Sequence, residues 1–240
     1  MNRALYAAAS GMAAQQKTLD LVSDNLANAD VAGFKGAVAS FAAIGGDSQL
    51  GTAPTGTHQI FTQGKLMKSG GPFDVAIDGT GFFRIERSGV HAFTRAGSFS
   101  RGADGLLRNA EGWHLEGVRV PAGATSLSVG LDGGVRASVA GGHEMSGGRI
   151  ALATFDAPER LHVIDSAVFG ATPEAGRPQR LPAGHDRQPK IVFGMLEKSN
   201  VSIIESMMSI LSAQRAYEAN SKGVQAADEM LRIANNLHRS

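Results

Sequence analysis

The chain has 240 residues, 42% of them hydrophobic, and its 23 lysine and arginine residues nearly balance 22 aspartate and glutamate residues. Because charges of one sign form no blocks, attraction to nucleic acid or anionic lipid is weak, and neither is expected as a partner. The lack of cysteine excludes disulfides, thiolate catalysis and cysteine zinc sites, and membrane insertion is not expected because no run of about 18 apolar residues occurs.

Residues 1–29 predict an amphipathic helix that begins at residue 2 and ends at residue 28. Its stripe advances in alternating steps of three and four residues, as the a and d positions of a coiled coil do. The stripe comprises Leu5, Ala8, Met12, Gln15, Leu19, Val22, Leu26 and Ala29. Polar residues between Gln15 and Asp20 interrupt the apolar core that a secretion signal needs, so no cleaved signal peptide is expected.

Residues 30–60 predict a connector. Asp30 and Gly33 favour the turn and left-handed conformations that end a helix. Residues 45–57 are rich in glycine, serine, threonine and proline, and this composition predicts an exposed loop.

Residues 61–199 predict an antiparallel β domain made of short alternating runs bounded by glycine. The expected strands are Phe73–Ile77, Phe82–Ile85, His91–Thr94, Leu106–Arg108, Trp113–Leu115, Leu127–Val129, Val135–Val139, Ile150–Phe155 and Lys190–Met195. Asp-Gly pairs such as Asp78-Gly79 and Asp104-Gly105 tolerate the positive φ of tight hairpin turns. Residues 173–189, with four prolines, predict a surface loop.

Residues 200–240 predict a second helix with the same seven-residue pattern. Its stripe comprises Ile203, Met207, Ile210, Gln214, Tyr217, Ser221, Val224, Asp228 and Leu231. Between Val201 and Leu211 apolar residues cover more than one face, which a simple helix pair cannot bury. We therefore expect neighbouring subunits to cover this surface, and both terminal segments to become helical on assembly.

The predicted fold class is α+β, with a coiled-coil-like pair of terminal helices and an inserted antiparallel all-β domain. The residues expected to form the assembly interface lie on the two terminal segments. They are Leu5, Met12, Leu19, Val22, Leu26, Ile203, Ile204, Met207, Met208, Ile210, Leu211, Tyr217, Val224 and Leu231.

Catalytic and cofactor motifs are weak in this sequence. The seven histidines show no metal-ligand spacing, and neither Gly64-Lys65 nor Gly79-Thr80-Gly81 completes a nucleotide-binding loop. Asp74 and Asp78 could act as an acid and base pair, but carboxylates near turns more often bind local amides or water. We expect no enzyme activity, no metal and no cofactor.

Several motifs resemble those of bacterial flagellar rod and hook proteins. The first is Asn25, Leu26, Ala27 and Asn28 followed by Gly33, Phe34 and Lys35. The others are Asp74–Phe83, Thr94–Phe99, and Ser199–Val201 followed by Ala213–Glu218 and Asn220–Lys222, in the order that the family has them. The opening residues and the short connector favour a proximal over a distal position in the rod, whereas Ala226–Leu231 is similar to the distal protein.

The resemblance implies a structural, axial component of the flagellar basal-body rod in the periplasm. Its terminal helices would form the inner wall of a helical tube around the export channel, with the β domain outside. The implied partners are copies of the chain, other rod and hook proteins, and the flagellar type III export apparatus. The alternative is a secreted β-domain binding protein whose helices make a small closed oligomer.

Overall fold

The computed structural model describes residues 2–45, 51–130, 133–139, 143–181 and 189–237. Terminal helices and antiparallel sheets confirm the predicted α+β class. The chain forms two compact units, the first from residues 1–27, 37–60 and 202–240 and the second from residues 28–36 and 61–201. The predicted connector is thus divided, because residues 30–36 belong to the second unit and residues 37–60 to the first.

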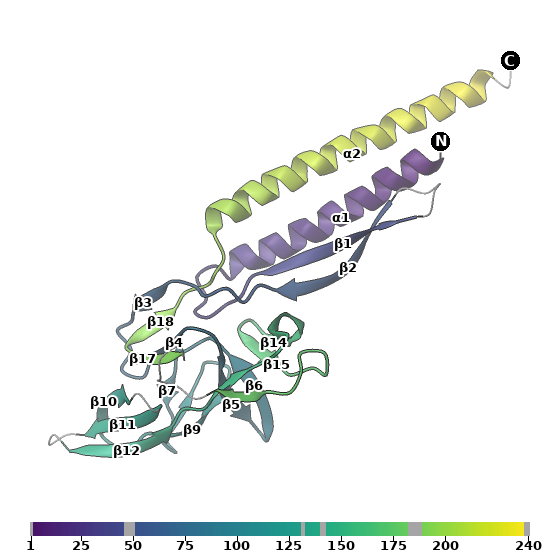
Figure 1. The fold of residues 1–240 in the computed structure, drawn as a ribbon. Coiled ribbons are helices and arrows are strands. Elements are labelled where there is room, and N and C mark those ends of the chain that lie inside the picture. The colour runs from purple at the N-terminus through teal and green to yellow at the C-terminus, as the bar shows by residue number, and fades with distance from the viewer. Residues whose placement is uncertain (1, 46–50, 131–132, 140–142, 182–188, 238–240) are drawn as a thin grey trace. The chain divides into compact units, whose positions relative to one another are not determined.

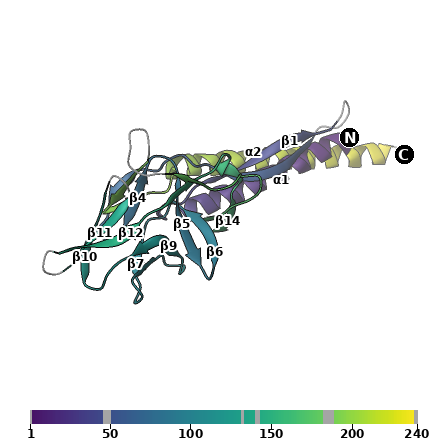
Figure 2. The same cartoon turned by 60° about the horizontal axis from the view of Figure 1, so that its bottom comes forward.

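The first unit contains helices α1 (Asn2–Ala27) and α2 (Ile203–Leu237), which run antiparallel, and a hairpin of β1 (Ala37–Ile44) and β2 (Gly51–Gln59). Both strands contact α1, and the hairpin and the two helices lie side by side in Figures 1 and 2. None of the helices in the described residues is long and apolar enough to cross a membrane.

The loop predicted for residues 45–57 is wrong at Gly51–Thr57, which lie in β2 and pair with β1. Val38, Thr52 and Thr57 are good strand formers, and Pro54 fits because both strands of an isolated hairpin are edge strands. A bulge between Ser40 and Phe41 absorbs the irregularity. The rest of the predicted loop includes residues 46–50, which lie outside the described ranges.

Small side chains form the contact between the two helices. Ser206, Ala213 and Ala227, which are seven and then fourteen residues apart, lie on one side of α2 and are all buried. Near the middle of the pair, a methyl group on Gly11 would lie only 2.9 Å from Asn220 Nδ2, so the Asn220 side chain packs directly on Gly11. The terminal segments were expected to become helical only on assembly, but both are helices in the single chain. There α1 contacts the β1-β2 hairpin as well as α2, and these contacts add to those of a single helix pair.

The second unit is built from short strands. They are β3 (Leu66–Lys68), β4 (Val75–Asp78), β5 (Phe82–Arg87), β6 (Val90–Thr94), β7 (Ser100–Arg101), β8 (Leu106–Arg108), β9 (His114–Arg119), β10 (Ala124–Val129), β11 (Gly134–Val139), β12 (Glu144–Arg149), β13 (Leu152–Thr154), β14 (His162–Asp165), β15 (Val168–Gly170), β16 (Gln179–Leu181), β17 (Lys190–Phe193) and β18 (Met195–Glu197). A 3-10 helix spans Pro158–Arg160.

Within the described residues, the largest sheet has the order β10-β11-β12-β9-β5-β6-β15-β14, with β7, β8, β13 and β16 paired off this path. Two smaller sheets pair β17 with β4 and β18 with β3. All these pairings are antiparallel, as predicted. Strand β16 lies in the segment expected to be a surface loop, whose residues 182–188 fall outside the described ranges.

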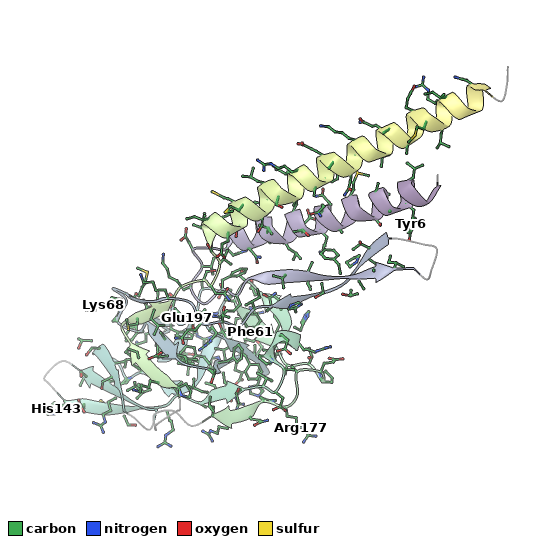
Figure 3. The ribbon with its side chains drawn as sticks, turned by 45° about the horizontal axis from the view of Figure 1, so that its top comes forward. Tyr6, Phe61, Lys68, His143, Arg177 and Glu197 are labelled. Carbon is green, nitrogen blue, oxygen red and sulfur yellow. The ribbon has the colours of Figure 1, made fainter. Side chains whose placement is uncertain are left out.

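Two apolar clusters form the core of the second unit. The larger includes Phe83, Leu115 and the side chain of Trp113. The smaller is aromatic: the Phe61 ring lies 5.1 Å from the rings of both Phe82 and Phe169 in edge-to-face contact. Phe61 points into this unit in Figure 3.

Candidate functional site

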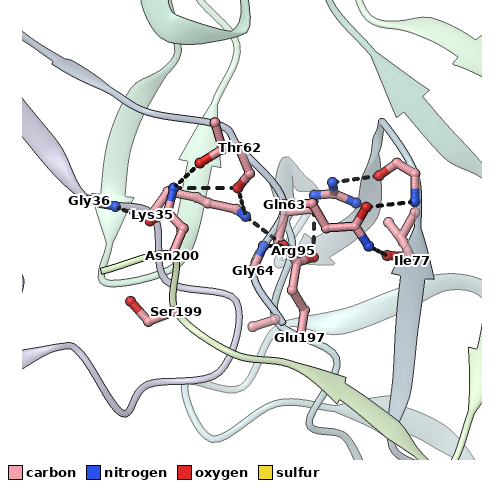
Figure 4. Close-up of polar contacts among 12 residues, drawn as sticks. Lys35, Gly36, Thr62, Gln63, Gly64, Ile77, Arg95, Glu197, Ser199 and Asn200 are labelled. Atoms are coloured by element: carbon pink, nitrogen blue, oxygen red, sulfur yellow. Dashed lines mark hydrogen bonds and ion pairs between the residues drawn. The ribbon is translucent and has the colours of Figure 1, made fainter. Parts of the chain in front are cut away.

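Three oppositely charged side chains are buried together inside the second unit, where Lys35 and Arg95 meet Glu197. Lys35 Nζ lies 2.6 Å from Glu197 Oε1, and neither side chain has any solvent exposure. Lys35 Nζ also donates to the Thr62 carbonyl oxygen, and the amide of Gly64 donates to the same carboxylate oxygen of Glu197. Glu197 Oε2 faces Arg95 Nε at 3.6 Å. Figure 4 shows these contacts together.

Burial and charge act in opposite directions on these groups. Burial lowers the pKa of Lys35 from its usual value, and the attraction of Glu197 opposes that shift. Burial also lowers the pKa of Arg95 against the same attraction. With two cations around one carboxylate, the cluster depends on Glu197 for its compensating charge.

Asn200 joins the same cluster through its side chain. Its Oδ1 accepts a hydrogen bond from the Gly36 amide at 2.8 Å, and its Nδ2 donates to Thr62 Oγ1 at 3.1 Å. The Asn200 amide donates to the Phe34 carbonyl oxygen. Figure 4 shows Asn200 beside Gly36 and Thr62. We call Gly33, Lys35, Thr62, Gly64, Arg95, Glu197 and Asn200 the junction cluster.

Two glycines allow the backbones of the junction cluster to come together. Gly33 has φ +70°, its amide donates to the Glu197 carbonyl oxygen, and a Cβ there would lie 2.2 Å from the Ala96 nitrogen. A Cβ on Gly64 would lie 1.9 Å from the Lys198 carbonyl oxygen. Only glycine fits such approaches.

The junction cluster contains the residues where the chain leaves the second unit. Residues 36, 61 and 201 are the last or first of that unit at three of its connections to the first unit. Gly36, Thr62 and Asn200 stand at or next to these residues and are bonded to one another. The cluster therefore fastens three separate stretches of chain within one small volume.

The motif residues predicted at the end of the first helix have distinct places. Gly33, Phe34 and Lys35 are buried in the second unit. In the first unit, the Asn25 side chain exchanges two 2.8 Å hydrogen bonds with the backbone of Ala37, as a neighbouring strand would. Leu26 and Asn28 are half-buried, and Ala27 is exposed.

The predicted interface residues divide into two groups in the single chain. Half-buried are Leu5, Met12, Leu19, Val22, Leu26, Ile210, Val224 and Leu231, and exposed are Ile203, Ile204, Met207, Met208, Leu211 and Tyr217. Ile204 keeps 72% and Met208 66% of its surface exposed. The interface itself stays a prediction.

The exposed apolar residues at the start of α2 form one surface, which we call the outer face of α2: Ile203, Ile204, Met207, Met208 and Leu211. At 3.6 residues per turn these five lie within an arc of about 140°. The buried Ser206, Ala213 and Ala227 lie on roughly the opposite side of the helix. The stripe predicted as one seam thus includes exposed residues such as Ile203 and half-buried ones such as Ile210, and the buried small side chains are not among its members.

Asp74 and Asp78, which were considered as an acid and base pair, lie in different environments. Asp74 is buried and accepts a hydrogen bond from the Ser69 hydroxyl, whereas Asp78 at the end of β4 is exposed. Asp74 thus binds a nearby hydroxyl, whereas the commoner interpretation expected a local amide or water.

Sequence comparisons match this arrangement along the whole chain. Three family models match: the flagella basal body rod protein model at residues 5–35, the flagellar hook protein FlgE/F/G D1 domain at residues 76–137, and the flagellar basal body rod FlgEFG protein C-terminal model at residues 193–237. The flagellar basal-body rod protein FlgG of Borreliella burgdorferi is 35% identical over 264 residues, with all of both chains covered. The chain belongs to the flagellar basal-body rod protein family.

Two differently named members of the family have almost the same sequence identity to this chain. In Caulobacter vibrioides, the basal-body rod protein FlgG is 32% identical, covering 98% of this chain and 99% of its own, and FlgF is 30% identical, covering 98% and 97%. The predicted resemblance to rod proteins is confirmed. The preference for a proximal position stays a prediction, because relatives named FlgG, the distal rod protein, match at least as well.

Sequence reasoning included Arg95 and Asn200 among the motif residues but missed Glu197. The sequence does contain an indication of its burial. Glu197 follows the apolar residues of β17 and β18, at a position where a buried strand would be expected to have another apolar residue. A lone acid in such a run indicates a buried cation, which here is Lys35.

Proposed function

We propose that this protein is a structural subunit of the bacterial flagellar basal-body rod. It associates with copies of itself and with other rod and hook proteins into a helical tube that surrounds the export channel and transmits torque. The full-length similarity to rod proteins supports this function, and the alternative of a secreted binding protein has no comparable support. The proposal includes export through the flagellar type III apparatus without a cleaved signal.

The outer face of α2 is the observation that favours assembly. Full burial of an isoleucine, leucine or methionine side chain contributes roughly 1.5–3 kcal/mol. The five side chains of the outer face are exposed in the single chain, so a neighbouring subunit that covers them gains several kcal/mol toward the cost of association. Head-to-tail contacts of this kind need not close, and they build a filament rather than a small ring.

The junction cluster suits a subunit that carries mechanical load. Force that passes along the chain between the units enters the second unit through separate connections. Asn200 is hydrogen-bonded to both Gly36 and Thr62, and Lys35 forms an ion pair with Glu197. A force on one connection is therefore distributed to the others.

Ile204→Asp tests the assembly surface. Ile204 is so exposed that the single chain tolerates aspartate there, whereas a carboxylate covered by a neighbour without a partner is costly. In cells that carry the variant as their only copy, we expect electron micrographs of basal bodies to lack a complete rod. The purified variant should melt at the same temperature as the parent.

The matched control is Gln225→Asp, an exposed polar position of the same helix, and rods should form normally with it. Normal rods in the Ile204→Asp cells would refute the assembly surface. Light scattering separates the alternative function, which requires a discrete dimer or trimer that never elongates with partner rod proteins. Export is tested by cells without the type III apparatus, in which the chain should stay in the cytoplasm.

A further inference from the structure

A group of histidine and glutamate side chains lies on one face of the large sheet. Glu86 on β5 is paired in register with His91 on β6 and with His114 on β9. Directly paired residues in antiparallel strands project to the same face of the sheet. Glu116 follows His114 by two residues on β9 and therefore projects to that face as well.

Three of these side chains are arranged around a common point, and the fourth, His114, lies beside one of them, Glu86. Ligand atoms of Glu86, His91 and Glu116 all lie within 4.8 Å of one another. His91 Nδ1 is 3.8 Å from Glu116 Oε1, and His114 Nε2 is 3.8 Å from Glu86 Oε2. Both separations are too long for hydrogen bonds. Two ligands bound tetrahedrally to one zinc ion lie about 3.3 Å apart, so small side-chain rotations bring these groups to coordinating distance.

Arg84 fixes the position of one of the carboxylates. Its Nε lies 2.8 Å from Glu116 Oε2, and its Nη2 donates to Glu116 Oε1 at 3.3 Å. Glu116 Oε1 also faces His91. With Arg84 charged and the imidazoles neutral, two carboxylates give the group a net charge of −1. That charge attracts a divalent cation, and the guanidinium orients the ligand in the way that outer hydrogen bonds orient metal-bound carboxylates.

The site is also open to solvent. Glu86, His114 and Glu116 line a surface groove together with Arg119, Ser146 and Gly148. An ion can enter through the groove. All four ligands come from paired strands, which hold their positions better than loops do.

We propose that Glu86, His91, His114 and Glu116 form a binding site for a divalent transition metal, with Zn²⁺ as the favoured ion. Two imidazoles and two carboxylates are nitrogen and oxygen donors that zinc accepts in a four-coordinate site. The site is not recognisable in the sequence, because residues 86, 91, 114 and 116 have no ligand spacing along the chain. Their proximity comes from strand register alone.

Isothermal titration of the full-length, metal-free protein with Zn²⁺ at neutral pH tests the site. We expect one ion to bind per chain, and we expect His91→Gln and His114→Gln each to weaken binding at least ten-fold. His162→Gln, at an exposed position on β14, is the matched control and should bind as the parent does. Circular dichroism and the fluorescence of Trp113 verify that each variant is folded.

Titration with Co²⁺ gives a second readout that does not depend on affinity alone. A four-coordinate site gives much stronger visible absorption bands than hexa-aqua Co²⁺, and Glu86→Gln should abolish them. No binding to the parent protein, unchanged affinity in either histidine variant, or bands that persist in Glu86→Gln would each overturn the proposal.

Discussion

Lys35 Nζ lies 2.6 Å from Glu197 Oε1 although 162 residues separate them in the sequence. Lys35 belongs to the segment that follows α1, and Glu197 ends the last strand before α2. Their pairing brings the two ends of the second unit together, and the Gly33 amide adds a backbone bond to Glu197. The family motif Gly33-Phe34-Lys35 thus acts as a closing contact of the fold.

Replacement of Lys35 by methionine should destabilise the second unit by about 3 kcal/mol, because it leaves the buried Glu197 carboxylate with less compensating charge. Urea unfolding followed by the fluorescence of the buried Trp113 measures the change in the free energy of unfolding. Lys68→Met, at an exposed lysine labelled in Figure 3, should change it little.

The double variant Lys35→Met with Glu197→Leu distinguishes the energy of the ion pair from the cost of burying its charges. Glu197→Leu alone leaves two buried cations, Lys35 and Arg95, without their carboxylate. The double variant removes one of these two cations, so it should be more stable than Glu197→Leu alone. Additive losses in the double-mutant cycle would show that the ion pair contributes nothing specific.

Two glycines should respond in opposite directions to alanine. Gly33 has φ +70° and abuts the backbone of Ala96, so Gly33→Ala should cost well over about 1 kcal/mol. Gly223 lies within α2 with no atom near its would-be Cβ, so Gly223→Ala should stabilise the helix by about 0.5–1 kcal/mol. Thermal unfolding monitored by circular dichroism checks both, and a loss of stability in Gly223→Ala would contradict the open environment of that position.

Local patterns predicted the helices and many of the strands of the second unit, because a period of 3.6 or 2 residues is visible within a short stretch. They failed where structure depends on a distant partner. β2 forms because β1 pairs with it, and the glycine-rich β12 has no apolar alternation to reveal it. Glu197 acquires its role only from Lys35, which no local pattern includes.

The helix stripe shows a second limit of pattern reading. Alternating steps of three and four residues placed Ile203, Met207 and Tyr217 on one seam, and all three are exposed in the single chain. The helices instead meet through Ser206 and Ala213, since small side chains permit close approach. Hydrophobicity alone could not rank a small inner residue above a large outer one.

The carboxyl of Asp104 should titrate below its usual range. The hydrogen bond from Arg108, at 2.6 Å, lowers the pKa of Asp104 from the ordinary value of 3.8, and the Leu106 amide adds to the shift. Because the folded pKa is below the unfolded one, this stabilisation is present above about pH 4 and is lost as pH falls through the folded pKa. Arg108→Gln should raise the pKa of Asp104 in a carbon-13 NMR titration, whereas Arg136→Gln, on another hairpin, should leave it unchanged.

A larger side chain on the inner face of α2 should separate the helices. Ala213 is 4% exposed, so Ala213→Leu forces extra volume into the contact with α1 and should cost about 1–3 kcal/mol. Ala219 of the same helix is exposed, so Ala219→Leu makes the same chemical change outside the contact and should have an effect near zero. Thermal unfolding of the helical signal distinguishes them. Equal melting temperatures for the two variants would mean that Ala213 does not face α1 in the isolated chain. A lower melting temperature for Ala213→Leu alone would show that the inner face of α2 packs on α1, so that the opposite, outer face is the one available to neighbouring subunits.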